Sequence, residues 1–183
     1  MSSLHLAPNL PIPLEAVTQT FAILAKRGSG KTYTALVMVE EMLKAGLQTV
    51  VIDPVGVCWG LRAAANEKDA GLPIVVLGGD HGDLDIEAAS GAAIAEFVVK
   101  EGQPAVLDMS NFSGNEMLQF VTDFAEMLYH KNRSPLHLVI DEADAFIPQK
   151  PLPGEQRMLG AMDKIVRRGR ARGLGVGAVK ASW

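Results

Sequence analysis

Short apolar runs alternate along this chain with longer segments in which apolar residues recur every three or four positions. The runs are apolar almost throughout, which is typical of strands covered by helices on both faces. The periodic segments predict helices with one apolar face. Strands are predicted over 18–25, 48–52, 73–77, 105–109, 136–140 and 173–179, and helices over 31–45, 90–100, 114–130 and 155–172. This alternation predicts an α/β fold, with a mainly parallel sheet flanked by helices, in a single domain over residues 1–183.

The first residues differ from the rest because three prolines, Pro8, Pro11 and Pro13, interrupt them. We therefore expect an extended lead-in over residues 1–17. The strand, helix and strand that follow, over residues 18–52, predict a βαβ unit with a right-handed crossover.

The first predicted strand runs into Ala25-Lys26-Arg27-Gly28-Ser29-Gly30-Lys31-Thr32, a phosphate-binding loop pattern with Ala25 in place of its usual first glycine. Gly28 and Gly30 let the backbone curl closely around phosphate oxygens. Backbone amides of the turn and of the following helix then form a cradle for an anion. We expect Lys31 to reach the β- and γ-phosphates and the Thr32 hydroxyl to bind Mg2+.

Another apolar strand, 136–140, ends in two acids, Asp141 and Glu142. Parallel strands end at a shared edge of the sheet, so Asp141 is expected near Thr32. Asp141 is then the candidate holder of Mg2+, through bound water, and Glu142 the candidate that polarises the attacking water. The alternative is that the two acids only begin a solvated loop.

Two further features have two interpretations each. Asp53 ends the strand 48–52 and either faces a nucleotide or initiates the turn before Pro54. The last predicted helix places Arg157, Lys164 and Arg168 on one stripe, which is either a solvated face or the source of a phosphate contact. In the second case, an arginine near Gly169 or Gly173 contacts a phosphate in the same subunit or across an interface. The candidates for that contact are Arg167, Arg168, Arg170 and Arg172.

Composition limits the functional classes. The net charge of −4 gives no global electrostatic argument for nucleic acid, so a role on DNA requires a local basic surface. The single cysteine, Cys58, excludes an internal disulfide framework and suits a reducing cytoplasm. The N-terminus lacks the pattern of a signal peptide, and no apolar run reaches the length of a membrane span. We therefore expect a cytoplasmic protein without a membrane partner.

The chain resembles the ATPase core of the HerA-FtsK superfamily, the DNA-pumping motor ATPases. Four stretches carry the resemblance: 23–33, 51–56, 138–143 and 167–176. The first and third are common to many ATPases. The second, Val-Ile-Asp-Pro-Val-Gly, and the fourth, Arg-Arg-Gly-Arg-Ala-Arg-Gly-Leu-Gly-Val, are more specific. The residues 141–144 also spell the second motif of DEAD-box helicases, but the other motifs of that family do not follow.

This resemblance implies a three-layer RecA-like P-loop fold and an Mg2+-dependent ATPase. Family members form hexameric rings that hydrolyse ATP between subunits and translocate duplex DNA, often beside a nuclease, so a homo-oligomeric translocase or helicase is expected. The resemblance implies catalytic roles for Asp141 and Glu142, beside Lys31, and a place near the phosphates for Asp53. The expected nucleotide contacts are Lys26, Arg27, Gly28, Ser29, Gly30, Lys31, Thr32 and Tyr33.

The sequence also departs from the family. A glutamine that senses the γ-phosphate normally follows the last strand, whereas Gly177-Ala178-Val179-Lys180-Ala181 has none. The strand that normally flanks the first strand is missing, so we expect an apolar edge at 20–24 unless residues 1–14 or a neighbouring subunit cover it. These departures suggest a truncated member and leave a second hypothesis open: a subunit that binds ATP with negligible turnover. A small nucleotide kinase is disfavoured because no lid-like arginine segment is recognisable.

Overall fold

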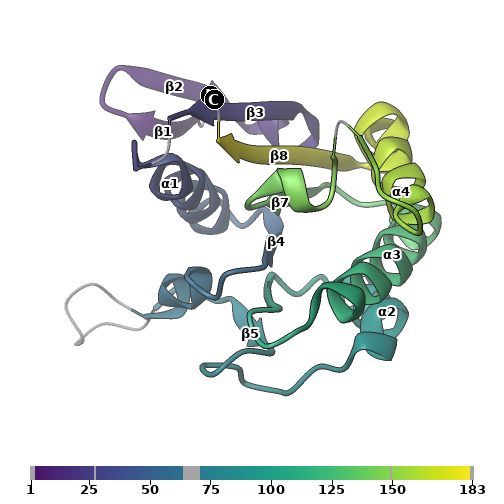
Figure 1. Ribbon diagram of the computed structural model, residues 1–183. Coiled ribbons are helices and arrows are strands. Elements are labelled where there is room, and N and C mark those ends of the chain that lie inside the picture. Colours follow the sequence, from purple (N-terminus) through teal and green to yellow (C-terminus); the bar gives the residue numbers. More distant parts are fainter. Residues whose placement is uncertain (1–2, 27, 64–70, 149, 182–183) are drawn as a thin grey trace.

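The computed structural model describes residues 3–26, 28–63, 71–148 and 150–181. Six strands form one parallel sheet in the order β3-β8-β7-β4-β6-β5 (Figure 1). The strands are β3 (Thr20–Ala25), β4 (Gln48–Asp53), β5 (Val75–Leu77), β6 (Ala105–Asp108), β7 (Leu136–Ile140) and β8 (Leu174–Ala181). The helices are α1 (Lys31–Lys44), α2 (Gly91–Glu101), α3 (Gly114–Lys131) and α4 (Gln156–Arg168). The α/β fold with a parallel sheet flanked by helices is therefore confirmed.

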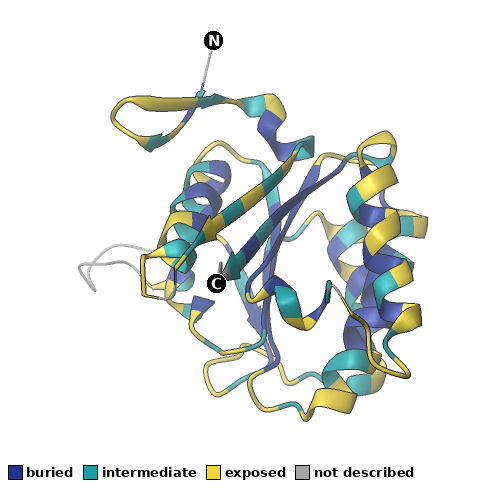
Figure 2. Ribbon diagram, turned by 45° about the horizontal axis from the view of Figure 1, so that its top comes forward, coloured by how far each residue is buried: buried dark blue, intermediate teal, exposed yellow. Residues whose placement is uncertain are grey.

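Helices cover the two faces of the sheet unequally. Helix α1 lies on one face, where Met38, Val39 and Met42 pack against the sheet. Helices α2, α3 and α4 lie on the other face, where Phe120 and Phe124 of α3 are fully buried. Figure 2 shows the buried strands between helices whose outer faces are exposed. None of the helices within the described residues has the length and apolar character needed to cross a bilayer.

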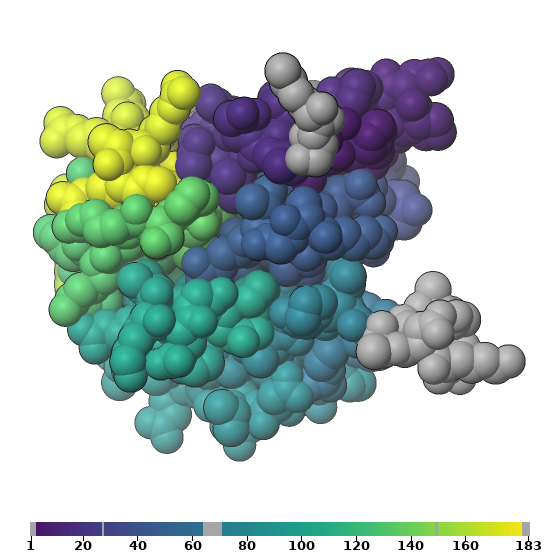
Figure 3. Space-filling view, turned by 180° about the vertical axis from the view of Figure 1, so that it is seen from behind, coloured from purple at the N-terminus to yellow at the C-terminus, as the bar shows by residue number. Residues whose placement is uncertain are grey.

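The residues before β3 form more structure than the predicted extended lead-in. Strands β1 (Ser3–Ala7) and β2 (Leu10–Pro13) pair as an antiparallel hairpin, and a 3-10 helix (Leu14–Thr18) follows. The hairpin is stabilised by burial of Leu4, which is 1% exposed and packs on the α1 side of the core. Prolines are compatible with this arrangement because an edge strand need not donate every amide. Figure 3 shows these purple residues at the same end of the molecule as the yellow C-terminal residues.

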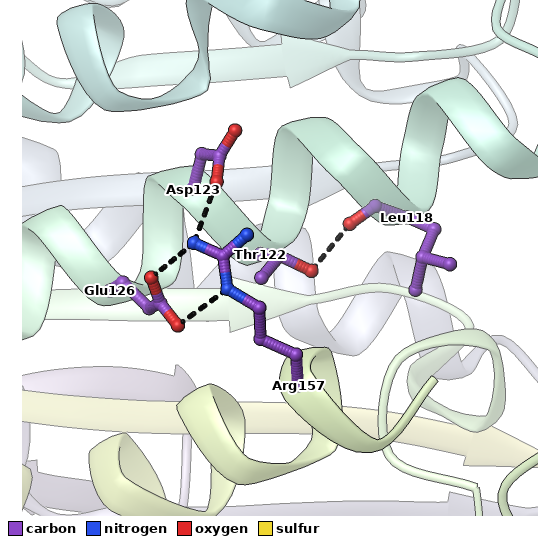
Figure 4. A network of polar contacts seen from close by, with 5 residues as sticks. All are labelled: Leu118, Thr122, Asp123, Glu126 and Arg157. Atoms are coloured by element: carbon purple, nitrogen blue, oxygen red, sulfur yellow. Dashed lines mark hydrogen bonds and ion pairs between the residues drawn. The ribbon is translucent and has the colours of Figure 1, made fainter. Parts of the chain in front are cut away.

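Ion pairs join α3 and α4. The Arg157 guanidinium donates to both carboxylate oxygens of Glu126, at 3.0 and 2.6 Å, and to Asp123 at 3.1 Å (Figure 4). In the same stretch of α3 the Thr122 hydroxyl donates to the Leu118 carbonyl at 2.6 Å. Arg157 therefore joins α4 to α3, and its guanidinium is occupied by these two acids.

Strand β3 lies at the edge of the sheet and, among the described strands, pairs with β8 only. Phe21 and Ile23 pack on the α1 side of the core, whereas Thr20, Ala22 and Leu24 are exposed on the other face. Leu24 is 61% exposed. The hairpin forms a separate two-stranded sheet, so it does not extend the main sheet at β3. The predicted apolar edge is therefore present in the structure.

Candidate nucleotide-binding site

The loop between β3 and α1 has the backbone that a phosphate cradle requires. Gly28 and Gly30 have φ angles of 76° and 86°, in the left-handed region that favours glycine. No atom lies within 4 Å of the position that a Cβ would take at either glycine, so the backbone conformation, not crowding, explains these two glycines. Gly30 caps α1, and the loop residues Gly28, Ser29 and Gly30 are exposed. The loop is therefore open to a ligand at the N-terminus of a 14-residue helix.

The Lys31 side chain lies back over this loop. Its ammonium donates to the Lys26 carbonyl at 3.3 Å, and the Ser29 amide donates to the same carbonyl at 3.3 Å. The positive charge of Lys31 is therefore held at the loop, where it can exchange a carbonyl oxygen for a phosphate oxygen. Tyr33, in the first turn of α1, is 74% exposed. Arg27, the remaining expected contact of this loop, lies outside the described residues.

Thr32 and Asp141 meet as the sequence predicts. The Thr32 hydroxyl donates to both carboxylate oxygens of Asp141, each at 3.3 Å, although the residues are 109 positions apart. Asp141 is only 4% exposed, and burial raises the pKa of its carboxyl above the ordinary value. The charge of nearby Asp53 raises this pKa further, while hydrogen bonds from the Glu142 amide and Thr32 lower it. A buried carboxylate with a raised pKa favours a cation beside it.

Glu142 follows Asp141 in a backbone conformation that side chains rarely adopt. Its φ is 45°, and it is the one non-glycine residue with positive φ among the described residues. The Glu142 amide donates to an Asp141 carboxylate oxygen at 3.1 Å, and the Glu142 side chain is exposed. Such strain costs on the order of 1–3 kcal/mol and tends to occur at functional sites. The turn directs the chain out of β7 and leaves the carboxylate at the open edge of the sheet.

The turn interpretation of Asp53 agrees with the structure. Asp53 is fully buried, and its carboxylate accepts backbone amides of Val55, Gly56 and Cys58 at 3.0, 2.8 and 2.7 Å. Both oxygens of Asp53 thus accept hydrogen bonds from its own loop, which accounts for its burial without a contact to nucleotide.

Oxygen donors for Mg2+ lie together at the site. Carboxylate oxygens of Asp53 and Asp141 and the Cys58 sulfur lie within 4.8 Å of one another. Mg2+ prefers oxygen ligands, so the thiol does not suit it, and burial raises the pKa of the Cys58 thiol, which keeps it protonated. The Thr32 hydroxyl and the Asp141 carboxylate fit Mg2+, because both are oxygen donors and the carboxylate is buried beside another acid.

The arginine cluster lies at the N-terminal ends of the strands, opposite the phosphate loop. A cavity of about 1020 Å3 is lined by Tyr129, Arg133, Arg167, Arg168, Arg170, Ala171 and Arg172. The Arg172 guanidinium lies 4.5 Å from the centre of the Tyr129 ring. The arginines of this cavity come just before the start of β8, whereas the phosphate loop comes just after the end of β3. Since β3 and β8 are parallel, the cavity and the loop lie at opposite ends of these strands. The seven steps between the first and last residues of β8, at about 3.3 Å each, span roughly 23 Å. Of the two alternatives for a phosphate contact, in the same subunit or across an interface, the structure therefore does not support the first.

Two charged residues at the nucleotide edge were not predicted from the sequence. Asp108 ends β6, is 2% exposed, and accepts the Ser110 amide and hydroxyl at 2.9 and 2.6 Å. An acid after an apolar strand was the available signal, as it was for Asp53. Lys180, near the end of β8, forms an ion pair with Asp144 at 2.5 Å.

Comparison with known families gives one match. Residues 3–56, from the hairpin through the phosphate loop to the turn after β4, match the family model "Helicase HerA, central domain". The family resemblance expected from the sequence is thereby confirmed over this segment. No curated protein matches the chain.

Solved structures similar to this chain include the genome packaging NTPase B204 from Sulfolobus turreted icosahedral virus 2. Its complex with sulfate matches with a TM-score of 0.50 at 14% identity, over 90% of this chain and 65% of that chain. Its complex with ATP-gammaS matches with a TM-score of 0.49 at 17% identity, over 90% and 66%. The pCW3 conjugation coupling protein TcpA matches with a TM-score of 0.48 at 16% identity, over 95% and 45%. This chain therefore spans less than two thirds of these proteins. The match to the sulfate complex, with its TM-score of 0.50, supports the fold alone.

Proposed function

We propose that this chain, whose residues 3–56 match the HerA central domain, is the Mg2+-dependent ATP-binding and ATP-hydrolysing domain of a HerA-type DNA translocase or helicase. The observation that carries the proposal is the meeting of Thr32 and Asp141 at 3.3 Å, directly after the glycine loop. This meeting unites the two halves of a phosphate site that the sequence places 109 residues apart. The family match supplies the preference for ATP.

The loop residues bind the triphosphate in this proposal. Backbone amides from Gly28 to Thr32 surround the β-phosphate, and the Lys31 ammonium leaves the Lys26 carbonyl for the β- and γ-phosphate oxygens. The Thr32 hydroxyl and the Asp141 carboxylate would hold Mg2+, the latter through water. Magnesium, when bound, neutralises charge that develops on the phosphate oxygens.

Glu142 acts on the water that attacks the γ-phosphate. Its exposed carboxylate accepts a hydrogen bond from that water and takes its proton as the water oxygen bonds to the γ-phosphorus. The bond from this phosphorus to the bridging oxygen breaks, and ADP leaves with the electron pair. The backbone at Glu142, with φ of 45°, is held beside Asp141 because the Glu142 amide donates a hydrogen bond to the Asp141 carboxylate. The two acids thus have separate roles: Asp141 serves the metal and Glu142 serves the water.

The arginine cavity fits a role in assembly. Arginines of one copy reach the γ-phosphate of a neighbour if subunits join head to tail, with the edge that bears Asp141, Glu142 and Asp144 facing the cavity of the next copy. Such heterologous contacts form rings when the rotation closes, which agrees with a homo-oligomer, for example a hexamer. Duplex DNA as substrate, a nuclease partner and a cytoplasmic location remain predictions from the family resemblance and the composition.

A second candidate function is ATP binding with negligible turnover. It is supported by the uncovered edge of β3, where Leu24 is 61% exposed, and by the absence of glutamine from β8. The two functions differ in phosphate release with and without duplex DNA. Release that DNA stimulates supports the motor, and tight binding without release supports the second candidate.

The test of the site itself is the variant Lys31→Ala. We expect it to lose ATP binding or hydrolysis, because the loop then lacks its cation. Lys100→Ala, in α2 with its side chain 83% exposed, is the matched control and should leave both unchanged. Equal ATP affinity and turnover in Lys31→Ala and the unaltered protein would refute the proposed site.

A further inference from the structure

Strand β8 lies between the two strands that carry the site. It pairs with β3, which leads into the phosphate loop, and with β7, which leads into Asp141 and Glu142. In this register Leu24 is opposite Lys180, and Ile140 is opposite Ala178. Lys180 of β8 is therefore level with the next-to-last residue of β3 and lies two residues beyond the position opposite Ile140. This places it at the ends of the strands where the site opens.

The Lys180 ammonium is held by an acid of the same edge. Its nitrogen lies 2.5 Å from a carboxylate oxygen of Asp144, in the 3-10 helix Ala143–Ala145 that follows Glu142. The Lys180 and Asp144 side chains are 27% and 38% exposed. Ion pairs that are open to solvent in this way are weak. A lysine has a flexible four-carbon stem, so its ammonium can change partners without movement of β8.

The charge balance of the site favours a second cation beside the phosphate loop. Asp53 ends β4 at this edge, and three acids follow β7 there: Asp141, Glu142 and Asp144. A triphosphate adds further negative charge. Lys31 lies at the loop, and Lys180 lies on the strand between the loop and the acids. A phosphate group carries more charge than the Asp144 carboxylate and offers three acceptor oxygens, so it competes well for the ammonium.

We propose that Lys180 contacts the terminal phosphate of a bound nucleoside triphosphate and leaves Asp144 when the nucleotide binds. The inference rests on the proposed function and adds a residue to its site. Lys180 then distinguishes ATP from ADP, because ADP lacks the phosphate that draws the ammonium away. Release of Asp144 would also free the 3-10 helix directly after Glu142, which links phosphate recognition to the residue that acts on water.

The test compares affinities for ATPγS and ADP by titration calorimetry. Lys180→Met should lose about ten- to hundredfold affinity for ATPγS, as expected when a charge-assisted contact is removed. Its affinity for ADP should stay within about twofold of the unaltered protein. Lys180→Arg keeps the charge and should retain most ATPγS affinity. Lys100→Met, in α2 with its side chain 83% exposed, is the control.

Asp144→Asn separates phosphate contact from a structural ion pair. If Lys180 contacts phosphate, removal of its competitor should leave ATPγS affinity equal or higher. If the Lys180–Asp144 pair only supports the fold, Asp144→Asn should weaken ATPγS binding as Lys180→Met does, which overturns the inference. Equal effects of Lys180→Met on ATPγS and ADP, or no effect, also overturn it. If the unaltered protein binds neither nucleotide, the proposed function itself fails.

Discussion

His137, the second residue of β7, makes the stability of this protein depend on pH. The ring is fully buried, and its Nδ1–H donates to the Val17 carbonyl at 3.0 Å. Its Nε2 has no hydrogen-bond partner among the described residues. A Cβ at Gly175 would lie 2.8 Å from Nδ1 and one at Gly177 3.0 Å from Nε2, so the glycines of β8 close over the ring. Water therefore has little room to solvate the charged imidazolium that a second proton would create.

Burial lowers the pKa of His137 from 6.5 to about 4, although the bond to Val17 acts in the opposite direction. Because the folded-state pKa is below the unfolded value, the unfolded chain binds the proton more readily. The contribution of His137 to stability is therefore complete above pH 6.5 and is lost as the pH falls from 6.5 to about 4. A fall in this pKa from 6.5 to about 4 corresponds to roughly 3 kcal/mol of unfolding free energy, a large part of the roughly 5–15 kcal/mol typical of a folded domain.

The assay is urea denaturation at several pH values between 7 and 4, on the unaltered protein and on His137→Gln, whose amide can still donate to Val17. Carboxyl groups titrate in both proteins, so the difference between the two curves isolates His137. We expect the variant to lose about 3 kcal/mol less of its unfolding free energy over this range. His130→Gln, at an exposed position, should behave like the unaltered protein. Parallel curves for the unaltered protein and His137→Gln would refute the reasoning.

Two further predictions concern the nucleotide site. Glu142→Gln should keep ATP bound but slow single-turnover phosphate release by about 10^2–10^4-fold, because the attacking water loses its proton acceptor; unchanged turnover would remove Glu142 from the mechanism. Gly30→Ala should lower the free energy of unfolding by about 1–2 kcal/mol, because φ at this position is 86°. The same substitution at Gly160, inside α4 with open space around it, should raise it by about 0.5–1 kcal/mol, and a fall of equal size in both variants would contradict the argument.

Local pattern was sufficient to predict most of the architecture. The runs that became β3, β4 and β7 are apolar enough to be recognised as buried strands, and Gly46 marks the end of α1 with a φ of 72°. The meeting of Thr32 and Asp141 followed from one rule, that parallel strands end at a common edge. These features were predictable because each depends on residues close in sequence or on a general property of parallel sheets.

Other features depend on information that the sequence pattern does not contain. The hairpin is stabilised because Leu4 reaches the core beside α1. This contact is not visible in the local pattern, where three prolines indicate an extended segment. Asp53 satisfies its carboxylate with amides of its own loop, which spacing alone did not distinguish from a contact with nucleotide. The position of the arginines near Gly169 could be predicted only from the direction of β8, which places them at the strand ends opposite the phosphate loop.

The separation of the phosphate loop from the arginine cavity, at opposite ends of parallel strands, gives the protein a polarity. If two copies join through the same end of each, the contact brings the two phosphate loops together or the two arginine cavities together. Only a repeated contact of unlike ends brings guanidinium groups to a neighbour's phosphates throughout an assembly. Every copy in such an arrangement serves one neighbour and depends on the other, so a single defective subunit would silence a site that it does not itself contain.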